Sequence, residues 1–272
     1  MALANGLANV QGRHPIFSFG VIADVQYADV PDGHSFLDIV DGKCPKDQSV
    51  DAVKRVVGEF EKFRGPVSRI MSVVTHAYYD FSPTPVYRFF VLDGYDISAI
   101  GWPHDHPNTL EALKILSEKS PNSNKTSPEG LKDVDRRFVM FNGEVGIEQM
   151  EWLDSVLQDA TNTKQKEIVC CHLPLDPGAT GKTLLLWNYD QVLDVIHRYD
   201  CVKVCLTGHS HKGRYSIDSH GFYHKVLDAA LECPPGSDAF GYIDVYDNML
   251  SLVGTDRLEN TDFSFGSLTN FR

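Results

Sequence analysis

The chain has 272 residues, of which 42% are hydrophobic and 23% are charged, and its formal net charge at pH 7 is −12. This length suits one large α/β domain, and the composition is that of a globular protein rather than of a disordered chain. The negative charge argues against binding to long nucleic acids, because phosphate backbones favour basic surfaces. No apolar run reaches membrane-spanning length, and residues 1–14 lack the apolar core expected of a signal peptide.

The six cysteines, among them Cys170 and Cys171 in an apolar run, have no paired zinc-ribbon spacing. Adjacent thiols in an apolar run are typical of reduced, buried cysteines rather than of disulfides. We therefore expect a cytoplasmic protein, and a monomer that binds neither nucleic acid nor membrane. The chain has no internal repeat and no low-complexity linker, so we expect a single domain over residues 1–272, with flexible ends at residues 1–15 and 259–272.

The first half of the chain alternates between strand and helix patterns. Phe17–Ala23 is apolar on both faces and ends in polar residues, which is typical of a buried strand. Val50–Phe63 has its apolar residues on one helical face and is followed by a Gly-Pro stop signal. Further along come a second strand, a second helix and a polar surface loop, predicted at Tyr87–Leu92, Pro107–Ser120 and residues 120–135.

The second half continues the alternation and leads two strands into histidines. Ile147–Ala160 has its apolar residues on one face of a helix. Glu167–Cys171 predicts a strand that leads to His172, and Val202–Leu206 predicts one that leads to a Gly-His-Ser-His segment at residues 208–211. A further helix and a hairpin are predicted at Tyr189–Tyr199 and at Gly241–Tyr246 with Met249–Val253. This alternation is typical of a layered α/β fold.

Side chains that can bind metals follow three of the predicted strands. They are Asp24 and Gln26 after the first strand, His172 after another, and His209 with His211 after a third. In α/β sheets, sites collect at the carboxyl ends of strands, so we expect these residues to converge. Carboxylate, amide and imidazole donors together suit manganese, iron or zinc better than calcium. Taken singly, each motif also fits a plain alternative, either a polar strand end or a buried histidine at a turn.

Five longer segments carry a resemblance to a known family, and they are spread over nearly the whole chain. They are FSFGVIADVQYADV (residues 17–30), YYDFSPTPVYRFFVLDGYDIS (78–98), RRFVMFNGEVG (136–146), GHSHKG (208–213) and ALECPPGSDAFGYIDVYDN (230–248). With these segments the chain resembles the calcineurin-like metallophosphoesterases, and within them the manganese-dependent ADP-ribose/CDP-alcohol diphosphatases, especially those of plants. The superfamily usually has Asp-x-His at its first motif, and the Asp24-x-Gln26 pair is the variant of this diphosphatase group.

The resemblance implies a fold, a cofactor and a reaction. The fold would be a β-sandwich core flanked by helices, and the cofactor two divalent ions, with manganese first and zinc or iron as alternatives. The reaction would be hydrolysis of the pyrophosphate bond in ADP-ribose, in CDP-alcohols such as CDP-choline, or in ADP. By motif, Asp24, Gln26 and His211 would hold one ion and His172 with His209 the other, Asp38 would bridge them, and Asn142 and Gly143 would contact the substrate.

Two blocks of the family pattern are missing from the chain. In place of Gly-Asp stands Leu37-Asp38, and too few residues separate it from Asp24 to form a crossover helix and a second strand. The Gly-Asn-His motif, which supplies a metal ligand and a histidine for the leaving oxygen, is absent. His76 is the candidate replacement in that stretch, and a plain loop histidine is the alternative. Glu144 stands where the family has a second glycine.

Two hypotheses about function therefore remain open. The first is an active metal-dependent hydrolase of nucleoside diphosphate-linked substrates, which the family pattern favours. The second is a catalytically impaired isoform that binds nucleotides or protein partners, which the missing ligands favour. The two blocks would be missing around residues 37 and 70, so the transcript at these points distinguishes a splice form or a gene-model error from the true sequence.

Overall fold

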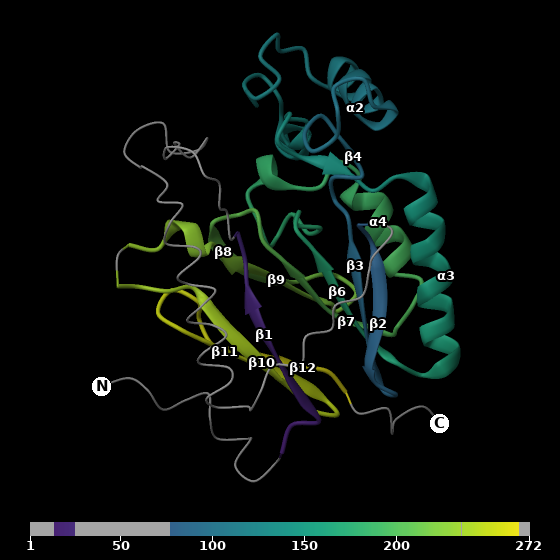
Figure 1. Ribbon diagram of the computed structural model, residues 1–272, viewed down its shortest axis with the longest axis vertical. Coiled ribbons are helices and arrows are strands. Elements are labelled where there is room, and N and C mark those ends of the chain that lie inside the picture. Colours follow the sequence, from purple (N-terminus) through teal and green to yellow (C-terminus); the bar gives the residue numbers. More distant parts are fainter. Residues whose placement is uncertain (1–13, 25–76, 235, 267–272) are drawn as a thin grey trace. The chain divides into compact units, whose positions relative to one another are not determined.

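The computed structural model describes three stretches of the chain, residues 14–24, 77–234 and 236–266 (Figure 1). They form two compact units. The first combines the described parts of residues 1–71 and 227–272, and the second comprises residues 72–226.

Several of the sequence-based predictions fall outside the described stretches. Three predicted site residues, Gln26, Asp38 and His76, lie there, and so does the helix predicted at Val50–Phe63. Among the described residues, no helix has the length and apolarity that a membrane crossing requires.

The first unit contains a four-stranded antiparallel sheet in the order β1-β10-β11-β12. Its strands are β1 (Phe17–Ile22), β10 (Phe240–Val245), β11 (Met249–Gly254) and β12 (Thr261–Ser264), and a short 3-10 helix, η3 (Ala230–Glu232), precedes β10. Phe17 lies opposite Val245, so residues from near both ends of the chain form one sheet. The β10–β11 pairing confirms the hairpin predicted from the sequence.

The prediction of a flexible tail at residues 259–272 is wrong for part of that range. Thr261–Ser264 forms β12, which pairs with β11 from Met249 to Leu252. Phe263 is the anchor, because its side chain is completely buried. A single apolar residue among polar neighbours gives no alternating pattern, so the sequence hides an edge strand of this kind.

The second unit contains a six-stranded sheet in the order β2-β3-β6-β7-β9-β8. Strands β3, β6, β7 and β9 run parallel, and β2 runs antiparallel to β3. The bounds are β2 (Tyr79–Thr84), β3 (Tyr87–Leu92), β6 (Lys166–Cys171), β7 (Val202–Thr207), β8 (Lys212–Ile217) and β9 (Tyr223–Asp228). The last two residues of β9 belong to the first unit.

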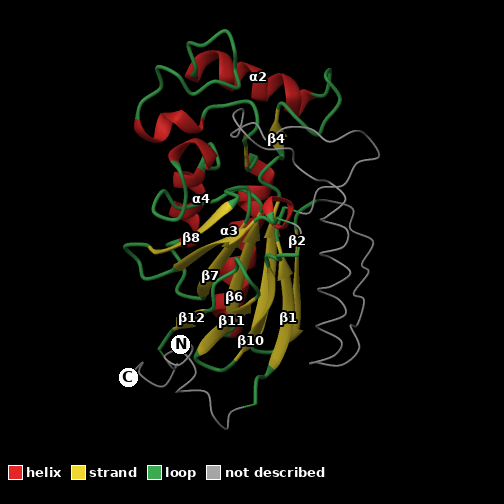
Figure 2. Cartoon of the chain, turned by 90° about the vertical axis from the view of Figure 1, so that its left-hand side faces the viewer, coloured by secondary structure: helices red, strands yellow, loops and turns green. Residues whose placement is uncertain are grey.

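Three helices and a small two-stranded sheet complete the second unit (Figures 1 and 2). Helix α3 packs on β6 and on α4, and α2 packs on β4, which pairs with β5. The elements are α2 (Pro107–Lys119), α3 (Ile147–Thr163), α4 (Tyr189–Ile196), β4 (Ile97–Ser98), β5 (Gly143–Glu144) and the 3-10 helices η1 (Asp133–Arg137) and η2 (Lys182–Leu184).

The apolar stripe of α3 explains why this helix covers the sheet. Leu153, Leu157 and Ala160 recur at helical spacing, and all three are completely buried in one cluster with Val169 of β6. Burying a leucine-sized side chain stabilises the fold by roughly 1.5–3 kcal/mol. The helix ends at Thr163 and is capped by Lys164, which has a positive φ of 58° and donates its backbone N–H to carbonyls of the last turn.

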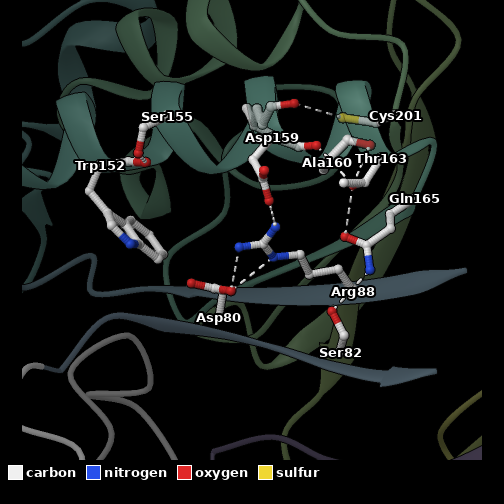
Figure 3. A network of polar contacts seen from close by, with 11 residues as sticks. Asp80, Ser82, Arg88, Trp152, Ser155, Asp159, Ala160, Thr163, Gln165 and Cys201 are labelled. Atoms are coloured by element: carbon white, nitrogen blue, oxygen red, sulfur yellow. Dashed lines mark hydrogen bonds and ion pairs between the residues drawn. The ribbon is translucent and has the colours of Figure 1, made fainter. Parts of the chain in front are cut away.

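A polar network adds a second attachment between α3 and the edge of the sheet (Figure 3). Arg88 of β3 reaches Asp80 of β2 at 2.7 Å and Asp159 of α3 at 2.7 Å. Gln165, just after the helix, donates to the hydroxyl of Ser82 at 3.1 Å. The guanidinium of Arg88 therefore connects two strands and the helix that covers them.

The α/β fold class and most of the predicted elements are confirmed. Each strand and helix predicted within the described residues is present, and the differences are confined to a few residues at the ends. The sequence pattern did not predict β2, β8 or β9. Strand β2 contains Ser82 and Pro83, and β8 is a largely exposed edge strand, so neither has a regular apolar pattern.

Candidate metal centre

The carboxyl ends of two adjacent parallel strands bring the predicted histidines together. His172 follows β6, and His209 with His211 follows β7. The backbone N–H of Gly208 donates to the carbonyl of His172 at 3.0 Å, which holds the two loops side by side. The His172 and His209 rings lie edge to face with their centroids 5.3 Å apart. Residues that are far apart in sequence thus form one imidazole cluster.

His209 is held in an uncommon backbone conformation at this position. Its φ is 62°, in the left-handed region that residues other than glycine rarely adopt. Asp24, which follows β1 in the other unit, has a φ of 54° and is buried. Each such residue costs on the order of 1 kcal/mol, and such strain is concentrated at functional sites. Two of the predicted ligands therefore share an uncommon backbone conformation, which also occurs at Asp133, Lys164 and Asp256.

Asn142 determines which nitrogen of His209 carries hydrogen. Its side-chain amide donates to the carbonyls of Arg137 at 2.8 Å and Thr183 at 2.7 Å. Its Oδ1 must then be the atom that lies 2.8 Å from His209 Nε2, and it accepts from that nitrogen. The Nδ1 of the neutral ring is left with a lone pair. The network thus prepares Nδ1 as the donor atom for a metal.

The predicted substrate residues Asn142 and Gly143 are both buried, and their described contacts are with the protein. The carbonyl of Gly143 accepts from the backbone of Trp187 at 2.8 Å. A Cβ at this glycine would lie 2.5 Å from the carbonyl of Gly94, so close backbone approach requires glycine here. These contacts give the pair a positioning role, and substrate contact stays a prediction. Neighbouring Glu144 has a pKa of about 7, raised by burial and by Glu111.

Burial keeps the His209 ring neutral. Desolvation, together with the neighbouring His172 and His211, lowers the pKa of His209 to about 3. A neutral imidazole is the form that coordinates metals, because the protonated ring has no free lone pair. The donor set of His172, His209 and His211 therefore fits a divalent transition metal.

Asp93 is a candidate site residue that the motif search missed. It follows β3, whose last residue pairs with Cys171, next to His172. Its Oδ1 accepts a hydrogen bond from the backbone N–H of Tyr95 at 2.9 Å. The backbone N–H of Asp93 donates to the side-chain oxygen of Gln149 at 2.8 Å. Desolvation raises the pKa of Asp93. The available signal was its place as the first polar residue after a buried strand, which is the criterion that found His172.

Tyr95 contacts both Asp93 and the histidines. Its ring centroid lies 5.8 Å from that of His172 and 6.5 Å from that of His209. Its hydroxyl lies 3.5 Å from Nδ1 of His209, which is a long and weak hydrogen bond. Aromatic rings on one side of the imidazoles lower the local dielectric constant and strengthen electrostatic interactions in the site.

Comparison with known proteins gives consistent relatives, although no protein-family model matches the chain. A manganese-dependent ADP-ribose/CDP-alcohol diphosphatase of Arabidopsis thaliana is 56% identical over 304 aligned positions, which cover 92% of this chain and 98% of the relative. The protein of the same name from Oryza sativa is 50% identical, and the alignment covers 97% of this chain and 99% of that relative. The crystal structure of a dimetal phosphatase from Danio rerio superposes with a TM-score of 0.82 at 27% identity, over 93% of this chain and all of that one.

The alignment with the Arabidopsis protein also shows what this chain lacks. Its 304 positions outnumber the residues available, since 92% of 272 residues is about 250. About 54 positions of the relative therefore have no counterpart here. The rest of the chain follows the relatives from end to end, and the structural match extends over nearly all of it. By this similarity, the chain belongs to the family of manganese-dependent ADP-ribose/CDP-alcohol diphosphatases.

Proposed function

We propose that this chain hydrolyses the pyrophosphate bond of nucleoside diphosphate-linked substrates, namely ADP-ribose and CDP-alcohols such as CDP-choline, with manganese as cofactor. The observation that supports it best is the pair of imidazoles that follow β6 and β7. In this pair, the hydrogen bond from His209 Nε2 to Asn142 leaves the lone pair of the neutral ring on Nδ1. The names of the relatives supply the substrate class and the metal.

The residues of this chain would act by holding and orienting. His172, His209 and His211 offer imidazole nitrogens to a bound ion. Bound divalent ions would stabilise the charge that develops on the phosphate oxygens and lower the pKa of water. Asn142 keeps the His209 ring in one tautomer and orientation. Tyr95 would shield one side of the His209 ring from water.

The experiment measures AMP release from ADP-ribose and CMP release from CDP-choline by the full chain with added Mn²⁺. We expect hydrolysis that requires Mn²⁺ and that is abolished in His209→Ala. His104→Ala is the matched control, because His104 is an exposed histidine in a loop after β4. Equal turnover in both variants, or hydrolysis without metal, would overturn the proposal.

A second candidate function rests on the missing positions. The plant relative has about 54 internal positions without a counterpart in this chain. We propose that the chain is a slow member of its family that retains nucleotide binding. Equilibrium dialysis with ADP-ribose, in the absence of Mn²⁺, would detect such binding. Retained binding with weak turnover supports this candidate, and turnover equal to that of the Arabidopsis relative refutes it.

We also propose that the chain works in the cytoplasm. The five cysteines within the described residues are free, and four of them are buried. Burial raises the pKa of Cys170 and of Cys171 to about 12, so both remain protonated thiols. Free buried thiols are typical of a reducing compartment. Fractionation of cells expressing the tagged chain would test this, and recovery in the secretory fraction would contradict it.

A further inference from the structure

A second cluster of histidines surrounds one carboxylate elsewhere in the 72–226 unit. His197 is the residue that caps α4 at its carboxyl end. Asp218 and His220 lie in the turn between β8 and β9, and His224 lies in β9. We call these four residues the Asp218 cluster. The predicted metal centre uses none of them.

Asp218 is held rigidly within the cluster. Its Oδ2 lies 2.9 Å from His197 Nε2 and 3.0 Å from His224 Nε2. Its Oδ1 accepts from the backbone N–H groups of His220 at 2.9 Å and of Phe222 at 3.0 Å. Burial opposes the charge, but the hydrogen bonds from His224 and His197 outweigh it and hold the pKa of Asp218 below its usual range. The carboxylate is therefore ionised and oriented.

The cluster lies at the opposite end of the sheet from His172 and His209. Strands β7 and β9 are parallel, with Val204 opposite Tyr223, so the start of β9 lies near the start of β7. His209 follows the other end of β7. The strand has six residues, and at roughly 3.3 Å per residue the two clusters are on the order of 20 Å apart. A ligand at one cluster would not contact the other.

We propose that His197, Asp218 and His220 bind a divalent transition-metal ion of the zinc type. One ligand atom from each residue lies within 4.8 Å of the other two. Two imidazoles and one carboxylate form a three-ligand set that suits zinc and leaves the fourth position to water. His224 completes the arrangement, because its hydrogen bond to Oδ2 orients the carboxylate in the way that outer partners orient metal ligands.

Binding requires a small local rearrangement that the cluster permits. Zinc–ligand bonds of about 2.0–2.1 Å place tetrahedral ligand atoms roughly 3.4 Å apart, so the cluster must contract. The His197 and His220 rings are stacked with centroids 3.7 Å apart, and an imidazole binds a metal in its own plane. His220 must therefore rotate, which is open to it because it is exposed and lies in a turn. His197 Nε2 loses its proton or shifts it to Nδ1.

The ion would attach an exposed edge strand of the sheet to a helix. Strand β8 is the edge strand, and most of its residues are exposed. Its turn is joined to α4 through the hydrogen bond between Asp218 and His197. Coordination by residues from both elements would add a three-ligand attachment to the hydrogen bond and to the ring stacking of His197 on His220. The folded state would gain stability in proportion to metal occupancy.

For the test, the full chain is first freed of metal and then dialysed to equilibrium against Zn²⁺. Elemental analysis then measures the zinc bound per chain. We expect His220→Ala to bind one equivalent of Zn²⁺ less than the unaltered chain. His104→Ala, which removes an exposed histidine elsewhere, should bind the same amount as the unaltered chain. Added Zn²⁺ should raise the thermal midpoint less in His220→Ala than in the other two proteins.

The metal-free thermal midpoint shows whether a variant has a folding defect, and the zinc contents of the three proteins show whether His220 binds the ion. Because His220 is exposed, its replacement should leave the metal-free thermal midpoint unchanged, and this midpoint is measured first. Equal zinc content in all three proteins overturns the proposal. An equal loss in both variants overturns it as well, since that would show weak binding by any surface histidine. Failure of Mn²⁺-dependent hydrolysis leaves the zinc count unaffected, because His220 is remote from His209.

Discussion

At the scale of single residues, the contact between Asn142 and His209 is the most informative feature of the site. In the structure the amide group of Asn142 contacts two carbonyls and one imidazole. Substrate contact by Asn142 stays a prediction, and the hydrogen bond to His209 suggests a positioning role beside it. Outer partners of this kind typically contribute 10- to 100-fold to metal affinity or activity.

We predict that Asn142→Ala raises the Mn²⁺ concentration needed for half-maximal hydrolysis by about 10- to 100-fold. The reason is that His209 loses the acceptor that fixes its tautomer. Asn122→Ala is the matched control, because Asn122 also donates to two carbonyls, those of Ser127 and Glu129, in a loop without histidine. A Mn²⁺ requirement that is unchanged in Asn142→Ala, at comparable thermal midpoints, would refute the positioning role.

Glu167 carries the second prediction at this scale. Its side chain in β6 is completely buried, and neither carboxylate oxygen has a hydrogen-bond partner among the described residues. Burial raises the pKa of Glu167 to about 8, against the opposing effect of Arg88. The folded state therefore holds this proton more tightly than the unfolded state, whose glutamate titrates near 4.3. The stability contribution is complete below that value and is lost as the pH rises through the folded pKa.

Glu167→Gln should remove this dependence. We expect the free energy of unfolding of the unaltered chain to fall between about pH 4.5 and pH 8, by up to about 1.4 kcal/mol for each unit of pKa difference. The variant should be as stable as the unaltered chain at pH 5 and more stable at pH 8.5. Urea unfolding at both values measures this. Glu129→Gln, at an exposed glutamate, should show no such gain, and parallel profiles for all three proteins would contradict the argument.

At the scale of elements, the attachment of α3 depends on an apolar stripe and on Arg88. The side chains of Arg88 and Asp80 are 14% and 26% exposed, so this pair is shielded from solvent more than ordinary surface pairs are, whereas Asp159 is 61% exposed. By contrast, Lys114 and Glu111 on α2 form a pair whose members are 61% and 49% exposed. Because the Arg88–Asp80 pair is more buried than the Lys114–Glu111 pair, we expect it to contribute more to the free energy of unfolding.

We predict that Arg88→Met lowers the free energy of unfolding by about 1–3 kcal/mol, because two carboxylates lose a charged donor. Lys114→Met should change it by less than about 0.5 kcal/mol, as is usual for exposed pairs. Chemical denaturation of both variants at neutral pH checks the difference. Equal effects would mean that α3 is held by its apolar stripe alone.

At the scale of the whole molecule, the missing positions bear on the rate that we expect of the chain. A two-metal mechanism needs both ions at a fixed short separation, which depends on a bridging carboxylate. In the sequence, Asp38 follows Asp24 too closely to lie at the end of a second strand, and the Gly-Asn-His motif is absent. The alignment independently finds about 54 positions missing from the chain.

We predict that inserting the missing internal segments of the Arabidopsis relative raises the rate of AMP release on the order of a hundredfold or more, since each lost stabilising group costs about that much. The control receives Gly-Ser segments of the same lengths at the same places, and it should not gain activity. Comparable turnover before and after restoration would show that other residues of this chain, with His76 as the first candidate, complete the site.

The elements that the sequence predicts well are those with a strong periodic pattern. Tyr87–Leu92 is a continuous apolar run that is buried on both faces, and its predicted bounds are those of β3. Ile147 begins α3 as predicted, because its apolar residues recur at helical spacing. Elements with mixed surfaces, such as β8 and β12, were missed, since their pairing comes from neighbours distant in sequence.

By itself, the sequence determined the α/β class, the family and the histidines after β6 and β7, because these depend on local periodicity and on motifs read along the chain. Only the tertiary structure decided which nitrogen of His209 faces Asn142, that Glu167 is buried without a hydrogen-bond partner among the described residues, and that His197 meets the β8–β9 turn. The physical reason is that these properties depend on side chains packed together across the sheet. Burial and hydrogen-bond partners are set by such long-range contacts, which no local pattern records.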